Sequence, residues 1–240
     1  VYKRQEIKPL KEVVESLSSY STAQLSSKEI DYSRALLQTE TKEVGKQKVQ
    51  IHRLSIPRGE TFKVVLSEGT EVFLNSDSRL AYPTVFKGKE RVVSLEGEAY
   101  FKVAKDAAHP FIVKSGNLQI RVLGTEFNVR SYSPTDVRVT LITGKVAVSD
   151  TCGVHSVEMV PGQSVQLSSD GTFAVNEVDI ELFLYWKEGF FYFDDVALVD
   201  MMKEIGRWYN IDIEFRNSKI MDLRCLLYTS PSPRDPKTSR

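Results

Sequence analysis

The sequence predicts a mainly β protein, in which a stacked, solenoid-like two-sheet β domain precedes a truncated small α+β domain with the order strand–helix–strand. Apolar residues recur at every second position between residues 51 and 178, which is typical of strands with one buried face. Glycine-centred turns separate these runs, and a single run with helical spacing follows only after residue 179. Periodicity does not separate stacked β-coils from a two-sheet sandwich, so both arrangements stay open.

The composition is that of a globular chain. Of the 240 residues, 41% are hydrophobic and 27% are charged, with 32 basic and 32 acidic side chains. Because no excess of Lys and Arg is present, the sequence argues against direct nucleic-acid binding. Cys152 and Cys225 form neither a C-x-x-C pair nor a multi-bridge framework. No run reaches the roughly 18 apolar residues that span a bilayer.

Residues 1–50 are expected to form a polar tether with weak helical character. They are rich in Lys, Glu, Ser and Thr, and apolar residues fall at helical spacing only near residues 10–17 and 30–36. A partly disordered linker is an equal alternative, because so few apolar side chains barely offset the entropy lost on ordering.

Residues 51–178 are expected to form the β domain. Residues 99–103 alternate cleanly, so Ala99 and Phe101 face the core while Tyr100 and Lys102 face the other way. Turns are expected at Gly69, Gly97, Gly124, Gly144 and Gly162. The predicted strands are 61–66, 71–74, 91–95, 99–103, 111–113, 118–123, 126–132, 137–142, 145–149, 157–160, 164–167 and 173–178.

Residues 179–224 are expected to form the truncated C-terminal α+β domain. Asp194 and Asp195 are predicted to cap a helix that ends at Tyr209 and Asn210. Residues 211–215 alternate apolar and acidic side chains, which favours a following strand. The predicted apolar stripe of the helix consists of Leu198, Met201, Met202, Ile205, Trp208 and Tyr209.

Residues 225–240 differ in texture from the rest of the chain. Three prolines within six residues are incompatible with a regular helix or a central strand. The string Cys225-Leu-Leu-Tyr-Thr-Ser-Pro-Ser-Pro-Arg-Asp235 resembles translated sequencing-adapter DNA. We therefore expect this segment to be a non-native, adapter-derived tail that cuts off the second domain.

Catalytic and metal-binding patterns are not found. His52, His109 and His155 stand far apart and lack ligand spacing, so neither a metal nor a cofactor is expected. Glu96 and Glu98 flank Gly97 about 6.6 Å apart if extended, a separation compatible with an inverting glycosidase, although acidic residues at β-turns are usually solvated. The sequence therefore predicts a protein that is not an enzyme.

The aromatic run after residue 189 suggests a contact with another protein. Such a run cannot face one way in a strand, so part of it is expected to be covered. An edge strand with surplus aromatic residues can accept a partner strand by β-augmentation. The residues assigned to this partner contact are Phe191, Phe193 and Ile213.

Several blocks, in a fixed order between residues 55 and 224, resemble the FecR family of sigma-factor regulators. The longest are residues 64–83 and 91–103. The shorter blocks include Ile56-Pro-Arg-Gly59, His109-Pro-Phe-Ile-Val113, Val122-Leu-Gly-Thr-Glu-Phe-Asn-Val129, Val139-Thr-Leu-Ile-Thr-Gly-Lys-Val146, Val160-Pro-Gly162, Trp186-Lys-Glu-Gly189 and Arg207-Trp-Tyr-Asn210.

The resemblance implies a function in signalling. FecR-like proteins are single-pass inner-membrane anti-sigma factors with a cytoplasmic segment that binds an extracytoplasmic-function sigma factor. Their periplasmic part meets the signalling domain of a TonB-dependent outer-membrane transporter, and proteases then release the sigma factor. By this resemblance the chain is the periplasmic sensor portion, at the periplasmic face of the inner membrane. The membrane anchor and the sigma-binding segment are expected upstream of Val1.

Two alternatives stay open beside the regulator. A carbohydrate-binding β module would line a groove with exposed aromatic residues such as Tyr82, Tyr100 or Tyr132. A solenoid glycosidase would depend on Glu98.

Overall fold

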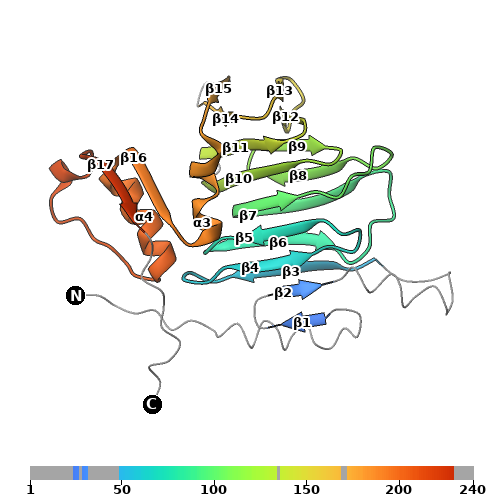
Figure 1. Cartoon of the computed structure of the whole chain (residues 1–240), viewed down its shortest axis with the longest axis horizontal. Coiled ribbons are helices and arrows are strands. Elements are labelled where there is room, and N and C mark those ends of the chain that lie inside the picture. The colour runs from blue at the N-terminus through green and yellow to red at the C-terminus, as the bar shows by residue number, and fades with distance from the viewer. Residues whose placement is uncertain (1–23, 27–28, 32–48, 134–135, 169–171, 230–240) are drawn as a thin grey trace, which may run out of the picture.

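The computed structural model describes residues 24–26, 29–31, 49–133, 136–168 and 172–229. It consists of a large β structure, here called the sheet domain, and a smaller C-terminal unit that begins at residue 179 (Figure 1). The prediction of a mainly β protein followed by a small strand–helix–strand unit is confirmed. The division of the chain into domains at the predicted boundaries stays a prediction.

The sheet domain has two layers that share strand β7 (Arg91–Lys102). The first layer has the order β1-β2-β4-β5-β7-β10-β11-β14-β15. Its other strands are β1 (Gln24–Ser26), β2 (Glu29–Asp31), β4 (Phe62–Val65), β5 (Glu71–Leu74), β10 (Glu126–Ser133), β11 (Asp136–Thr143), β14 (Gln163–Leu167) and β15 (Phe173–Glu177).

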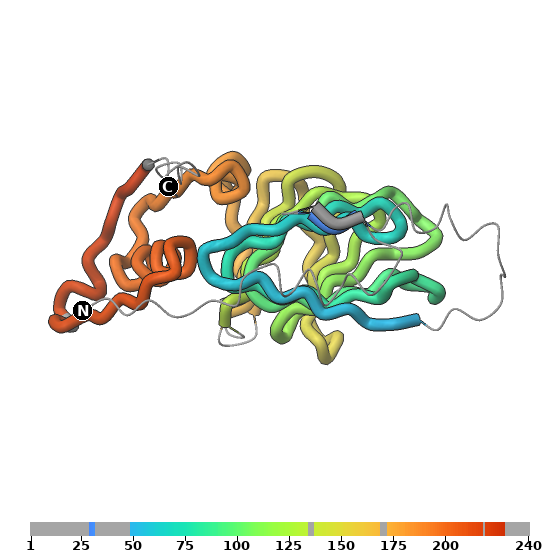
Figure 2. The backbone as a smooth tube through the Cα atoms, turned by 90° about the horizontal axis from the view of Figure 1, so that it is seen from below, coloured from blue at the N-terminus to red at the C-terminus, as the bar shows by residue number. Residues whose placement is uncertain are grey.

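The second layer pairs in the order β3-β6-β7-β8-β9-β12-β13. Its other strands are β3 (Ile51–Ile56), β6 (Ser78–Pro83), β8 (Phe111–Ser115), β9 (Leu118–Val122), β12 (Val146–Asp150) and β13 (Ser156–Met159). Figure 2 shows the chain turning from one layer into the other between β3 and β4. Apolar side chains of both layers meet in one continuous core, which includes Phe101, Phe111 and Phe127.

Strand β7 passes from one layer to the other at Gly97. Residues before Gly97 pair with β6 and β8, while residues after it pair with β5 and β10. Gly97 has a φ of +93°, and a Cβ atom there would lie 2.7 Å from the Ser78 Cα. The two strands predicted at 91–95 and 99–103 are therefore one strand, because the glycine bends the backbone without ending the pairing.

The C-terminal unit packs a helix against a two-stranded sheet. Strand β16 pairs antiparallel with β17, and the apolar stripe of α4 covers Phe191 and Phe193. The unit consists of η1 (Ile180–Phe183), α3 (Tyr185–Glu188), β16 (Phe191–Ala197), α4 (Leu198–Tyr209), η2 (Ser218–Ile220) and β17 (Arg224–Thr229).

Two predicted details of this unit are wrong. Asp194 and Asp195 lie in β16, and helix α4 begins after Ala197, which makes no side-chain cap. The carbonyls of Met221 and Leu223 accept hydrogen bonds from the Val199 and Leu198 amides, so backbone groups replace the cap. Residues 211–215 form no strand, and the partner of β16 is β17.

The two ends of the chain are described only in part. Most of the predicted tether lies outside the described residues, but Ile30 sits in β2 and is buried in the main core, so this short piece is a strand rather than a helix. At the other end, the predicted adapter-derived tail begins within β17, and residues 230–240 lie outside the described residues. Among the described helices, none has the length and hydropathy to cross a bilayer.

We predict that Gly97→Ala destabilises the sheet domain by about 3 kcal/mol, because a left-handed φ and a steric clash act together. Gly69→Ala is the matched control, since Gly69 has a φ of +88° and nothing within 4 Å of a Cβ atom. Gly69→Ala introduces backbone strain without a clash, so it should lower the free energy of unfolding by only about 1–2 kcal/mol. Urea unfolding measures both values, and equal losses would contradict the steric argument.

Candidate functional site

The seam between the sheet domain and the C-terminal unit collects charged and aromatic side chains. The apolar core of the sheet domain is separate from the apolar cluster formed by Phe191, Phe193 and Met201. The contacts that join the two parts include ion pairs, hydrogen bonds and cation–π contacts. The seam therefore carries polar and cation–π contacts, whereas the interiors of the two units are apolar.

A charge cluster of Glu98, Arg130 and Glu204 lies at the centre of the seam. Glu98 and Arg130 are direct cross-strand partners in β7 and β10, so the pairing register places them on the same side of the sheet. The Nη1 atom of Arg130 lies 3.6 Å from Glu98 Oε2 and 2.7 Å from Glu204 Oε2 on α4. Arg130 thus joins a carboxylate of the sheet domain to a carboxylate of the C-terminal unit.

Glu98 is buried and held by amide groups. The Nδ2 atoms of Asn75 and Asn128 donate hydrogen bonds to its two carboxylate oxygens, at 2.9 and 3.0 Å. The Ser78 hydroxyl accepts a hydrogen bond from the Glu98 amide at 2.9 Å. These contacts leave the Glu98 side chain little freedom, so it presents a fixed negative charge to Arg130.

Burial raises the pKa of Glu98, because desolvation disfavours the charged carboxylate; Arg130 opposes this shift and Glu204 adds to it. Burial also opposes the charge on Arg130, but the carboxylates of Glu204 and Glu98 outweigh it and the pKa of the guanidinium is raised. The cluster therefore holds a permanent cation between two acids, one of which takes up a proton more readily than an ordinary Glu.

A second group of contacts lies where the turn after β3 meets α4. Arg58 Nη1 lies 2.6 Å from Asp212 Oδ1, and its Nη2 donates to the Ile211 carbonyl at 2.6 Å. The Gly59 amide donates to the Arg207 carbonyl at 2.8 Å. The Arg207 guanidinium stacks 3.8 Å from the ring centroid of Tyr132. These contacts fix the C-terminal end of α4 against the sheet domain.

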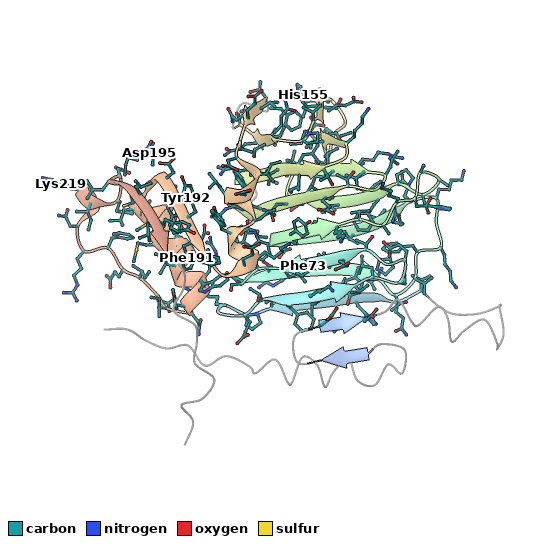
Figure 3. The ribbon with its side chains drawn as sticks, viewed as in Figure 1. Phe73, His155, Phe191, Tyr192, Asp195 and Lys219 are labelled. Carbon is teal, nitrogen blue, oxygen red and sulfur yellow. The ribbon has the colours of Figure 1, made fainter. Side chains whose placement is uncertain are left out.

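Helix α3 adds an aromatic contact on the other side of the cluster. The Lys187 ammonium lies 4.3 Å from the ring centroid of Tyr100 and 5.2 Å from that of Phe73. The Phe73 ring lies on the edge of the sheet domain nearest to α3 (Figure 3). A cation over two rings is favourable when it is partly desolvated.

A cavity of about 480 Å³ separates parts of the two units. Its lining includes Arg130, Arg138 and Thr140 from the sheet and residues 192–197 from β16. Trp186 Nε1 and Asn128 Oδ1, from two lining residues, are buried polar atoms without a hydrogen-bond partner. The cavity therefore offers polar groups and one strand of the C-terminal unit, and the carboxylates of Glu98 and Glu204 in its lining are both engaged by Arg130.

The predicted partner-contact residues do not share one surface. Phe191 and Phe193 stack at 5.8 Å between ring centroids and are buried against α4. Ile213 is half-buried and lines a different cavity, on the far side of α4, together with Arg58 and Tyr132. The role of these three residues in partner binding stays a prediction, and the two phenylalanines also serve the core of the unit.

Two expectations attached to the alternatives are wrong, whereas Tyr132 is half-buried and lines two cavities. Glu96 is exposed and pairs with Arg79, whereas Glu98 is buried, contrary to the expectation that both are solvated, and the two carboxylates line different cavities. The expectation of exposed Tyr82 and Tyr100 is wrong, since they are 1% and 4% exposed. Among the described residues no group of His, Cys, Asp and Glu is arranged to hold a metal ion.

The charge cluster is the part of the site that sequence reasoning missed. In the sequence, Glu98 stands out only through its spacing from Glu96. Arg130 and Glu204 belong to no recognisable motif. Arg130 follows Asn128 by two residues, so a polar face within the strand predicted at 126–132 was visible. That face, next to an otherwise apolar alternation, is the signal that could have pointed to a buried ion pair.

We predict that lowering the pH stabilises the protein relative to its Glu98→Gln variant. The folded state binds the Glu98 proton more tightly than the unfolded chain does, because the folded pKa is raised. This stabilisation is complete below the pKa of an unfolded Glu and is lost as the pH rises through the raised value. Gln keeps the shape and the Asn75 hydrogen bond but binds no proton.

Urea unfolding of both proteins between pH 4 and pH 8 measures this difference, and titrating groups that do not interact with Glu98 cancel in the comparison. The free energy of unfolding of the wild type, minus that of the variant, should grow as the pH falls. A difference that is constant, or that shrinks with acidification, would contradict a raised pKa.

Comparison with known proteins agrees with this architecture. Residues 52–147 match the model of the FecR protein family, and residues 190–228 match the FecR C-terminal family model. The second match reaches into the segment predicted to be adapter-derived, whose origin stays a prediction. No curated protein sequence matches the chain.

Two crystal structures of proteins from Parabacteroides distasonis, assigned as anti-sigma factors, have the same fold. The first is 29% identical, with a TM-score of 0.70 over 75% of this chain and 84% of that one. The second is 27% identical, with a TM-score of 0.68 over 75% and 85% of the two chains. With matches to both FecR models in the expected order, the chain belongs to the FecR family of anti-sigma factors.

Proposed function

We propose that the chain is the periplasmic sensor portion of an anti-sigma factor that relays a signal from a TonB-dependent outer-membrane transporter. The observation that carries the proposal is the match of both parts of the chain to the FecR models, in the same order. The signalling domain of the transporter is the proposed direct partner. The sigma factor is bound by a cytoplasmic segment of the regulator, and regulatory proteases act on the loaded complex.

The two-part architecture supports a relay. A small unit with its own apolar cluster sits on a larger sheet domain through charged contacts, so a partner can act on the unit without unfolding the sheet. Within the described residues, β16 pairs with β17 alone. One edge of β16 is therefore unpaired within the described residues, as the sequence-based hypothesis of strand addition requires.

The chemistry of the described residues favours binding over catalysis. The buried carboxylate of Glu98 is occupied by two amides and Arg130, so it has no free geometry for acid–base work. The exposed histidines His109 and His155 pair with the neighbouring carboxylates of Asp106 and Asp150 within their own loops. These arrangements are consistent with a regulatory protein at the periplasmic face of the inner membrane.

Isothermal titration calorimetry tests the proposal. The chain is titrated with the N-terminal signalling domain of the TonB-dependent transporter encoded beside it. We expect a dissociation constant of about 1 μM or lower, equivalent to about −8 kcal/mol. The absence of heat and of any complex at high concentration would refute the relay and leave only a resemblance of fold.

We predict that Ile213→Asp weakens this binding by about tenfold, because a charge replaces a half-buried apolar contact on the C-terminal unit. Ile220→Asp is the matched control, since Ile220 belongs to the same unit but is 37% exposed and lies outside the cavity that Ile213 lines. The same titration measures both variants. Equal affinities would remove Ile213 from the interface.

A further inference from the structure

The C-terminal unit and the sheet domain have separate apolar clusters, and ion pairs join the two units. The closest of them are the pairs Arg130–Glu204 and Arg58–Asp212, at 2.7 and 2.6 Å. Polar interfaces between units of one chain permit relative motion more readily than apolar ones do. The seam is therefore a place where the molecule can open while both parts stay folded.

Glu98 is the fixed element of this attachment, and Arg130 is the element that it positions. Asn75 and Asn128 hold the Glu98 carboxylate inside the sheet domain, and Arg130 lies between this carboxylate and Glu204. If the guanidinium is removed, Glu98 and Glu204 face each other without a cation. The attraction across the seam at this point is then lost, because Glu98 either repels Glu204 or takes up a proton.

In the closed position, one side of β16 faces the cavity between the two units. Residues 192–197 of this strand line the cavity between the units, and the opposite wall carries Arg138 and Thr140 of β11. Strand β16 lies on the side of its two-stranded sheet that is nearer to the sheet domain (Figure 1). This cavity of about 480 Å³ is partly open, and Asp194 and Asp195 of β16 are exposed, so the closed position covers one side of the strand without burying it.

We propose that Glu98, Arg130 and Glu204 act as a clamp that holds the C-terminal unit closed, and that opening of this clamp gives a partner strand access to the edge of β16. The clamp itself is a property of this chain alone. The second half, access of a partner, rests on the proposed function.

Spin labels on the two units test the clamp in the full chain. One label occupies the exposed native Cys152, and the other occupies Lys219→Cys in a Cys225→Ser background. Lys219 lies at the outer end of the C-terminal unit, and His155, a close sequence neighbour of Cys152, lies at the top of the sheet domain (Figure 3). Pulsed electron paramagnetic resonance then gives the distribution of distances between the units.

The wild type should show one dominant distance. Arg130→Met should add a second population at longer distance, with an open-to-closed ratio raised about tenfold by the loss of a charge-assisted pair. Arg79→Met is the matched control, because it breaks the exposed Arg79–Glu96 pair within the sheet domain and should leave the distribution unchanged. An unchanged distribution in Arg130→Met would overturn the clamp.

Glu204→Gln separates opening from damage to the sheet domain. It keeps Arg130 and Glu98 together in the sheet and weakens only the contact to α4. It should produce the same longer distance while the melting temperature of the sheet domain stays at the wild-type value. A longer distance seen only together with a lowered melting temperature would overturn the proposal.

Titration of the variants with the transporter signalling domain tests access to β16. Glu204→Gln should bind more tightly than the wild type, because a larger fraction of the chain is competent to bind. Opening without any gain in affinity would refute the second half and leave the clamp standing. Opening without binding by any variant would refute the proposed function, again without touching the clamp.

Discussion

The arrangement of the seam depends on the burial of one carboxylate. Glu98 is withdrawn from water inside the sheet, and an uncompensated charge in such a place is strongly unfavourable. Asn75 and Asn128 supply hydrogen bonds, and Arg130 supplies the opposite charge. Arg130 has further N–H donors, and Glu204 of α4 accepts from one of them. The burial of the Glu98 carboxylate therefore also affects where the C-terminal unit is placed.

Hydrophobic periodicity in the sequence predicts strands and helices whose packing repeats along a short segment. It does not predict features that depend on residues far away in the sequence. Period-two spacing identified most strands, and the stripe of α4 was recognised because its packing repeats within twelve residues. The alternating residues 211–215 were misread as a strand, since alternation states which side chains are buried but not which backbone pairs. The cap of α4 was misplaced because carbonyls some twenty residues later satisfy its first amides.

Most of the candidate site cannot be predicted from the sequence, because its residues are far apart in the chain and meet only in the folded structure. Glu98, Arg130 and Glu204 lie on β7, β10 and α4, and nothing in the spacing of 98, 130 and 204 relates them until the register of the sheet is known. Phe191 and Phe193 were identified as important, and the structure gives them a definite place in the apolar cluster of the C-terminal unit. Their neighbours at the seam are charged residues. The sequence gives the number of such residues but not their positions in the folded protein.

Strand β7 belongs to both layers of the sheet domain, and this constrains the order in which the chain can fold. This strand pairs with β5 and β6 before it in the sequence and with β8 and β10 after it, so both of its edges are complete only when residues up to 131 have joined. Pairings of this range form slowly, because the loop-closure entropy is lost before the contacts form. Synthesis from the N-terminus therefore proceeds well beyond β7 before the sheet domain becomes a stable body.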